Sequence, residues 1–373
     1  MDGEYGLKRH FNGDAARLLG GMIREFHPGF DVDGYASEVE GRIPGKELKD
    51  RVLVLAEGLR GRLPQDYNEA LVILVALLGD ELAEGEGMFN NGWYLMPVAR
   101  FVEEYGLKTP AESLDALVEI TRRHTAEYAV RPFIEQWYDL TMPRLAEFAC
   151  HPSHNVRRLA SEGTRPRLPW ARTLTRFVHD PDPVLRILDT LHDDPSDYVR
   201  KSVANNLNDI SRDNPEIALA AARRWLLASS GPGTSWTVKH GLRTLVKKGN
   251  QEALEILGVT GGEHVKVARF DVSPRSVILG DFVTIRVDLR NTDQKTHTVA
   301  VDYVVHHVRK GGRSIPKVFK LTTLELAGGE RRTVEKIHPI REVQTRRYYP
   351  GEHVIDIQVN GLVLASDRFD LDL

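Results

Sequence analysis

The chain has 373 residues, 41 % of them hydrophobic and 28 % charged, a composition typical of a folded globular protein with two or three domains. It contains one cysteine, Cys150, and no run of about 18 apolar residues, so an intrachain disulfide and a membrane-spanning helix are excluded. The opening Met-Asp-Gly-Glu-Tyr-Gly lacks the basic and apolar regions of a secretory signal. We therefore expect a cytoplasmic protein in which Cys150 is a buried structural thiol.

The net charge of −3 is distributed unevenly along the chain. Residues 1–143 contain 15 Lys and Arg against 25 Asp and Glu, a balance of −10. Residues 144–249 contain 17 against 11, a balance of +6. A basic segment in an acidic molecule is typical of proteins that bind the phosphate backbone of nucleic acid.

The first part of the chain has the apolar spacing of helices. Helices are expected at 14–23 with Asp14 as N-cap, 48–59, 67–78, 94–105 and 113–123, with an acidic, glycine-rich loop at 79–91. Arg131-Pro132 is then expected to interrupt the helical chain and to fix Glu127 just before the break. The simpler interpretation of Glu127 is a surface carboxylate paired with Arg131 four residues later.

Residues 151–170 combine a short helix with an unusual charge pattern. Gly163 is expected to end this helix, which places Glu162 in the last turn, where the helix dipole disfavours an anion. Four arginines surround this carboxylate, and Trp170 follows the rigid Pro169. The pattern favours a functional site. The alternative is a carboxylate at a helix end that Arg165 simply neutralises.

A repeat follows. The pattern Pro-Ser-x-x-Val-Arg-Arg/Lys occurs at 152–158 and again 43 residues later at 195–201, and a weaker copy runs from Trp236 to His240. A period near 40 with two helices per unit predicts HEAT-type repeats, which stack into a solenoid with a concave surface. Stacking would align the two basic residues of each copy along one side, as a partner with regularly spaced negative charge requires. This basic row comprises Arg157, Arg158, Arg200, Lys201, Lys239 and Arg243.

The periodicity changes from 3.6 to 2 after a linker at 259–265. Segments such as 283–289, 299–304 and 354–359 alternate apolar and polar residues, and turn residues separate about seven short strands, which predicts an immunoglobulin-like sandwich at 266–373. The expected fold class is therefore mainly α, with a HEAT-like α-solenoid at 1–258 followed by a small all-β immunoglobulin-like domain.

Four segments resemble the AlkC branch of the HEAT-like DNA alkylation repair glycosylases. They are Thr125–Phe133, Leu159–Trp170, Ser202–Ile210 and Leu242–Gly249. The C-terminal sandwich is similar to the Ig-like extension of some members of this branch. The resemblance implies a monofunctional glycosylase that removes cationic alkylated bases, especially 3-methyladenine and 3-methylcytosine, from double-stranded DNA without base flipping.

The resemblance also implies an active site made of Glu127, Glu162, Trp170 and Asp209. A base alkylated on a ring nitrogen is a cationic leaving group, so the site needs carboxylates to stabilise an oxocarbenium-like sugar and to position water, but no general acid. We expect Glu162 and Asp209 to do this, with Glu127 assisting and Trp170 packing on the sugar or the lesion. The alternative for Asp209 is a helix cap before Ser211. The expected DNA-binding residues are Arg157, Arg158, Arg165, Arg167, Arg200, Lys201, Lys239, Arg243, Lys247 and Lys248.

No cofactor and no metal site are expected, because no Cys or His pair has ligand spacing. We further expect a monomer that acts in the bacterial cytoplasm without binding membranes. The competing hypothesis is a non-enzymatic HEAT-repeat scaffold for protein or undamaged nucleic acid. It explains the solenoid and the basic row equally well, but it gives no reason for three carboxylates and a tryptophan among those positive charges.

Overall fold

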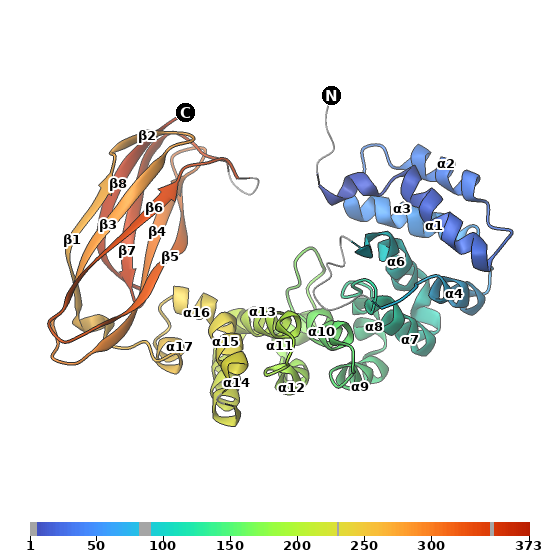
Figure 1. Cartoon of the computed structure of the whole chain (residues 1–373), viewed down its shortest axis with the longest axis horizontal. Coiled ribbons are helices and arrows are strands. Elements are labelled where there is room, and N and C mark those ends of the chain that lie inside the picture. Colours follow the sequence, from blue (N-terminus) through green and yellow to red (C-terminus); the bar gives the residue numbers. More distant parts are fainter. Residues whose placement is uncertain (1–5, 82–90, 230, 344–346) are drawn as a thin grey trace. The chain divides into compact units, whose positions relative to one another are not determined.

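The computed structural model describes residues 6–81, 91–229, 231–343 and 347–373 (Figure 1). The chain forms two compact units. The first comprises residues 1–214 and 225–241, and the second comprises residues 215–224 and 242–373. None of the helices within the described residues has the length and apolar character needed to span a membrane.

The first unit begins with short helices packed around Leu19, Ile23, Tyr35, Leu55 and Leu59, all essentially buried. These elements are η1 (Leu7–His10), α1 (Gly13–Phe26), α2 (Val32–Arg42), α3 (Leu48–Arg60), α4 (Tyr67–Ala76), η2 (Trp93–Leu95), α6 (Met96–Tyr105), η3 (Gly106–Lys108) and α7 (Pro110–Thr121). The expected cap of the first helix was wrong: the side chain of Asn12, not Asp14, accepts hydrogen bonds from the first turn of α1. Most of the predicted 79–91 loop lies outside the described residues.

The repeat region continues as paired helices. They are α8 (Arg131–Gln136), α9 (Tyr138–Phe148), α10 (His154–Gly163), α11 (Thr175–His179), α12 (Asp182–Leu191), α13 (Asp197–Asp213), α14 (Pro215–Ala228) and α15 (Pro232–Gly241). Helix α10 packs on α13 and α13 on α15, while α9 and α12 form a second layer against α10 and α13 (Figure 1). The predicted HEAT-like solenoid is confirmed.

Two local expectations differ from the structure. Arg131-Pro132 begins α8 instead of breaking a helix, because the fixed φ of proline suits the first helical turn, where no N–H partner is needed. Cys150 lies in the turn after α9 and is exposed, so the expectation of a buried thiol was wrong.

The second unit carries the sandwich. Its elements are α16 (Arg243–Lys247), α17 (Gln251–Ile256), η4 (Gly262–His264), β1 (Val265–Ser273), β2 (Ser276–Ile278), β3 (Phe282–Asn291), β4 (His297–Val308), β5 (Ser314–Leu326), β6 (Arg331–Pro339), β7 (Gly351–Val359) and β8 (Leu362–Asp372). One sheet has the order β1-β3-β6 and the other β2-β8-β7-β4-β5, with only β2 and β8 parallel among the described pairs. Alternate residues of β3, from Val283 to Leu289, are buried between the sheets, which confirms the predicted sandwich.

The segment around residue 258 packs against the sandwich. Leu254 and Val259 contact Ala300 of β4, and the Thr260 amide donates to the Thr298 carbonyl at 3.0 Å. Strand β1 begins at Val265, inside the segment expected to be a linker. Helices α16 and α17 therefore belong to the second compact unit, although their apolar spacing continues the helical pattern of the repeats.

Candidate active site

Three carboxylates from separate segments meet in the first unit. Glu127 lies in the turn between α7 and α8, Glu162 in the last turn of α10, and Asp209 inside α13. Their residues are only 6 %, 6 % and 2 % exposed. A buried carboxylate is costly unless opposite charges and hydrogen-bond donors surround it. The partners of these three carboxylates therefore determine their charge state and orientation.

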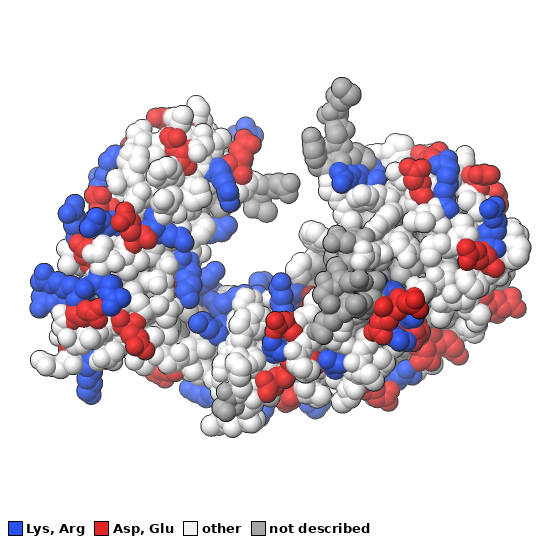
Figure 2. Space-filling view, viewed as in Figure 1, with Lys and Arg blue, Asp and Glu red and all other residues white. Residues whose placement is uncertain are grey.

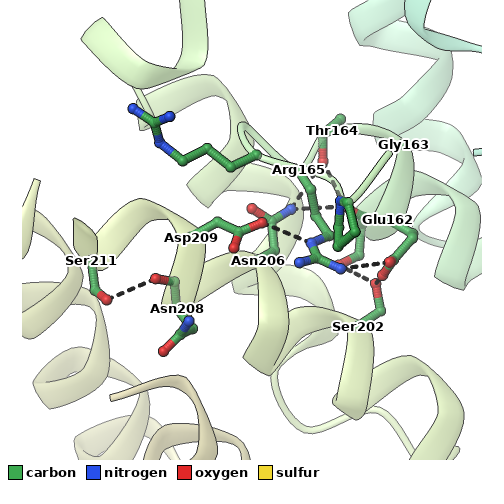
Figure 3. A network of polar contacts seen from close by, with 12 residues as sticks. Glu162, Gly163, Thr164, Arg165, Ser202, Asn206, Asn208, Asp209 and Ser211 are labelled. Atoms are coloured by element: carbon green, nitrogen blue, oxygen red, sulfur yellow. Dashed lines mark hydrogen bonds and ion pairs between the residues drawn. The ribbon is translucent and has the colours of Figure 1, made fainter. Parts of the chain in front are cut away.

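Arg165 joins two of these carboxylates. Its Nη1 donates to Glu162 Oε1 at 2.7 Å, and its Nε donates to Asp209 Oδ2 at 2.9 Å. Figure 3 shows the guanidinium group of Arg165 between Glu162 and Asp209, with the Ser202 side chain next to the Glu162 carboxylate. The Ser202 hydroxyl donates to Glu162 Oε2 at 2.6 Å. Both oxygens of Glu162 are therefore held, and its side chain is fixed in orientation.

Arg158 extends the chain of charges to the third carboxylate. Its Nη1 donates to Glu127 Oε2 at 3.2 Å, and its Nη2 lies 3.7 Å from Glu162 Oε1. The order Glu127–Arg158–Glu162–Arg165–Asp209 alternates negative and positive groups, and we call it the carboxylate network. Three carboxylates against two guanidinium groups leave one formal negative charge in excess.

The pKa values of the two carboxylates that Arg165 joins are shifted in opposite directions. Burial raises the pKa of Glu162, but Arg158, Arg165 and the Ser202 hydrogen bond outweigh it, so the pKa lies below its ordinary value. Burial dominates at Asp209 and raises its pKa above the ordinary value, although the Arg165 hydrogen bond opposes this. The surroundings of Glu162 therefore favour its anionic form, and burial makes Asp209 a stronger base than an ordinary aspartate.

Each of the three carboxylates also had a non-functional interpretation in the sequence. The alternatives for Glu127 and Asp209 were wrong, and the one for Glu162 describes a contact that the structure contains. Glu127 pairs with Arg158 and not with Arg131, whose guanidinium donates instead to three main-chain carbonyls, those of Gly163, Arg165 and Arg172 at 3.0, 2.8 and 2.6 Å. Asp209 is not a cap before Ser211, because it lies within α13 and accepts from Arg165. The pair between Glu162 and Arg165 does exist, but it is one link of the larger network.

Trp170 stands on the loop between α10 and α11. Its residue is 81 % exposed, and its φ of 62° lies in the left-handed region that non-glycine residues rarely adopt. The Tyr128 hydroxyl donates to the Pro169 carbonyl at 3.2 Å, and the Lys49 ammonium donates to the Trp170 carbonyl and lies 4.2 Å from the centre of the Tyr128 ring. An exposed indole on a backbone that neighbouring side chains hold in an unusual conformation is typical of a contact residue.

The predicted DNA-binding residues fall into two groups in the structure. Some are bonded to carbonyl or carboxylate groups of the protein itself, and others are exposed. Arg157 donates to the carbonyls of His151 and Pro152 and pairs with Asp194, its Nε lying 2.6 Å from Asp194 Oδ2. Arg200 donates in the same way to the carbonyls of Asp194 and Pro195. These two guanidinium groups, like those of Arg158 and Arg165, are held by groups of the fold itself.

The remaining basic side chains are more accessible. Arg167 pairs with Asp213 at 2.7 Å near the surface, and Lys201 and Lys239 are exposed in the first unit. Lys and Arg side chains lie among Asp and Glu side chains on the face drawn in Figure 2. Lys247 and Lys248 are exposed in the second unit, where Arg243 is partly buried. Sequence patterns do not identify Lys49 as a site residue, because it lies 121 positions from the carbonyl that it binds. Ser202 and Tyr128 lie within the segments that resemble the family, but the resemblance implied no role for either residue.

Comparisons with known proteins agree with this arrangement of a helical-repeat unit and an appended sandwich. The family model for the C-terminal Ig-like domain of the uncharacterised protein YhaZ matches residues 266–373. Uncharacterized protein YhaZ of Bacillus subtilis is 34 % identical over 367 residues, which is 98 % of this chain and 99 % of that protein. The fold and the site therefore define a HEAT-like repeat protein with an Ig-like domain of the YhaZ type.

A solved structure matches over the same length. The alkylpurine DNA glycosylase AlkC of Pseudomonas fluorescens, bound to DNA containing an abasic site analogue, is 33 % identical with a TM-score of 0.91, covering 99 % of this chain and 100 % of that one. The chain belongs to the family that contains AlkC and YhaZ.

Proposed function

We propose that this protein is a monofunctional DNA glycosylase that releases cationic alkylated bases, foremost 3-methyladenine and 3-methylcytosine, from double-stranded DNA. The full-length similarity to AlkC supports the reaction class. The observation that carries the proposal is the carboxylate network, in which buried anions outnumber cations. Such a group is suited to a reaction that creates positive charge.

The reaction needs little help at the leaving group. When the C1′–N bond of a cationic base breaks, its electron pair moves to the base, which leaves neutral, while positive charge develops on the deoxyribose. An anion fixed beside that sugar stabilises the transition state more than the ground state. We assign this role to Glu162, whose lowered pKa keeps it ionised.

The second step is addition of water to C1′. Asp209 is suited to accept the water proton, because a carboxylate with a raised pKa is a stronger base. Glu127 adds negative charge at the far end of the network. Arg158 and Arg165 act as positioning residues, since they fix the carboxylates and do not themselves favour a cation.

Binding to the duplex is assigned to the accessible residues. Trp170 packs against the deoxyribose or the edge of the cationic lesion, where an aromatic face is favourable. Lys201, Lys239 and Arg167, together with Arg243, Lys247 and Lys248 of the second unit, contact phosphates. We propose that the base stays in the duplex and that the protein acts as a monomer in the cytoplasm.

Product analysis separates this proposal from a non-enzymatic scaffold. Methylated duplex DNA is incubated with the protein and a chelator, free bases are measured by chromatography, and abasic sites are measured with and without alkali. We expect release of 3-methyladenine and 3-methylcytosine, with strand breaks only after alkali. Binding of the same DNA without any base release would favour the scaffold. Strand breaks without alkali would instead indicate a lyase, with Lys247 or Lys248 as the candidate nucleophile.

A further inference from the structure

Three side chains of metal-ligand type converge at one end of the sandwich, in the second unit. His264 ends η4, Asp293 lies in the turn after β3, and His297 is the first residue of β4. One ligand atom from each lies within 4.8 Å of the others. Among the described residues this is the one group of three His, Cys, Asp or Glu with that property.

The spacing of the ligand atoms is close to that of a coordinated ion. His297 Nε2 lies 2.7 Å from Asp293 Oδ2, and His264 Nε2 lies 3.9 Å from the same oxygen. Bonds of about 2.0–2.1 Å in a tetrahedral zinc site place neighbouring ligand atoms roughly 3.4 Å apart. The two observed distances lie on either side of that value. Small side-chain rotations would open the hydrogen-bonded pair and bring His264 closer.

The main chain around these residues is tightly organised. The Thr292 amide and hydroxyl both donate to the His264 carbonyl at 2.8 Å, and the Gln294 amide donates to Asp293 Oδ1 at 2.6 Å. Gly261, with a φ of +73°, lies so close to the His297 ring that a Cβ there would come within 2.2 Å of Nδ1. The second carboxylate oxygen of Asp293 and the main chain of His264 are thus already held, as the outer contacts of metal sites require.

We propose that His264, Asp293 and His297 bind a divalent transition-metal ion of the zinc type, with water completing its coordination. Two imidazoles and a carboxylate are ligands that such ions prefer. The ion would join η4, directly after the α17 region, to the β3–β4 turn. The site is structural and belongs to the second unit, so it is independent of the proposed glycosylase reaction. Sequence spacing could not reveal it, because η4 and β4 are brought together only by the sandwich.

The test is zinc binding by the full-length, tag-free chain. Zinc is titrated in competition with a chromophoric chelator at neutral pH, and we expect one ion per chain. His264→Gln and His297→Gln should each weaken binding at least about tenfold, because each removes a direct ligand. The matched control is His306→Gln. His306 Nε2 also lies 2.7 Å from a carboxylate oxygen, that of Asp356, but the pair belongs to no group of three among the described residues. This variant should bind zinc like the wild type.

Two further measurements keep the test decisive. Zinc should raise the Tm of the wild type and of His306→Gln but not that of the His264→Gln/His297→Gln double variant. Cobalt(II) added to the wild type alone should give the intense visible absorption of a low-coordinate site, so the result does not depend on whether the variants fold. Absence of binding by the wild type, or equal binding by the double variant, would overturn the proposal.

Discussion

Helices α10 and α13 begin with the same seven-residue pattern but use it for different purposes. Arg157 and Arg200 occupy equivalent positions, and each donates to two carbonyls of the turn that precedes its own helix. The next position differs. Arg158 lies between Glu127 and Glu162, whereas Lys201 is exposed. Arg157 and Arg200 therefore stabilise the same turn in each repeat, whereas Arg158, at the position that differs, belongs to the carboxylate network.

The two helices also end differently. Helix α10 stops at Gly163, where a Cβ would come within 2.5 Å of a Val130 methyl group, and the chain then enters the loop that carries Arg165 and Trp170. Helix α13 continues to Asp213, and this extra length contains Asp209. The early end of one helix and the longer course of its neighbour bring Arg165 and Asp209 together. The site residues Arg165 and Asp209 thus lie where these two helices differ from each other, and not where they repeat.

The strongest test of this comparison replaces the two equivalent residues after the shared arginine. Arg158→Ala leaves Glu127 and Glu162 without the cation between them, so we expect a loss of about 3–5 kcal/mol in the free energy of unfolding and a loss of base release of at least about 100-fold. Lys201→Ala should change stability by less than about 0.5 kcal/mol. Urea unfolding and single-turnover release measure both effects.

Lys201→Ala should still affect DNA binding. If its ammonium contacts a phosphate, its removal lowers the slope of log affinity against log salt concentration by about 0.9. Equal losses of stability in Arg158→Ala and Lys201→Ala would show that the two positions are not distinguished as we argue.

Trp170→Ala should have a smaller effect that is confined to function. The side chain is 81 % exposed, so stability should change by less than about 0.5 kcal/mol. Loss of an aromatic contact costs about 1–3 kcal/mol, so we expect roughly a tenfold loss in single-turnover kcat/KM on methylated DNA. Trp170→Phe should recover most of it. A fall in Tm with unchanged kcat/KM would assign the indole to the fold instead.

The dependence of rate on pH should identify the basic carboxylate. Burial raises the pKa of Asp209 above its ordinary value of 3.8, whereas the pKa of Glu162 is lowered from its own ordinary value. A protonated Asp209 cannot accept a proton from water. The rate of base release should therefore fall as the pH is lowered, and this fall should be centred above pH 3.8. The Asp209→Asn variant should release bases more slowly than the wild type, and its rate should not show this fall at acidic pH. If the variant shows the same fall at acidic pH, a group other than Asp209 is responsible for it.

The fold was largely predictable because its signals are local and periodic. The 43-residue offset between Pro152 and Pro195 predicted the stacked repeat, and the alternation in 283–289 predicted a buried strand. Local signals also misled: Asn12 capped α1 in place of Asp14, and Pro132 began a helix. Asn12 and Asp14 are both residue types that cap helices, and a proline suits the first turn of a helix as well as a break, so neither pattern decided the outcome alone.

The site was only partly predictable. The resemblance named Glu127, Glu162 and Asp209, and the structure brings these three into one network, but it did not indicate that Arg158 and Arg165 would be held inside it. A basic residue in register looks the same in sequence whether it faces solvent or a buried carboxylate. Lys49 and the metal-ligand group at His264 depend on contacts between distant segments, which no spacing rule reveals.

The most direct test of the central claim compares two substitutions of the same kind. Glu162→Gln keeps the shape of the side chain and removes the central negative charge of the network, whereas Glu147→Gln removes an exposed carboxylate that pairs with Arg144 on α9. Single-turnover release of 3-methyladenine is measured for both, together with DNA affinity. We predict that Glu162→Gln loses about 10²–10³-fold in rate while binding DNA as before, and that Glu147→Gln matches the wild type. Wild-type release by Glu162→Gln would contradict the account.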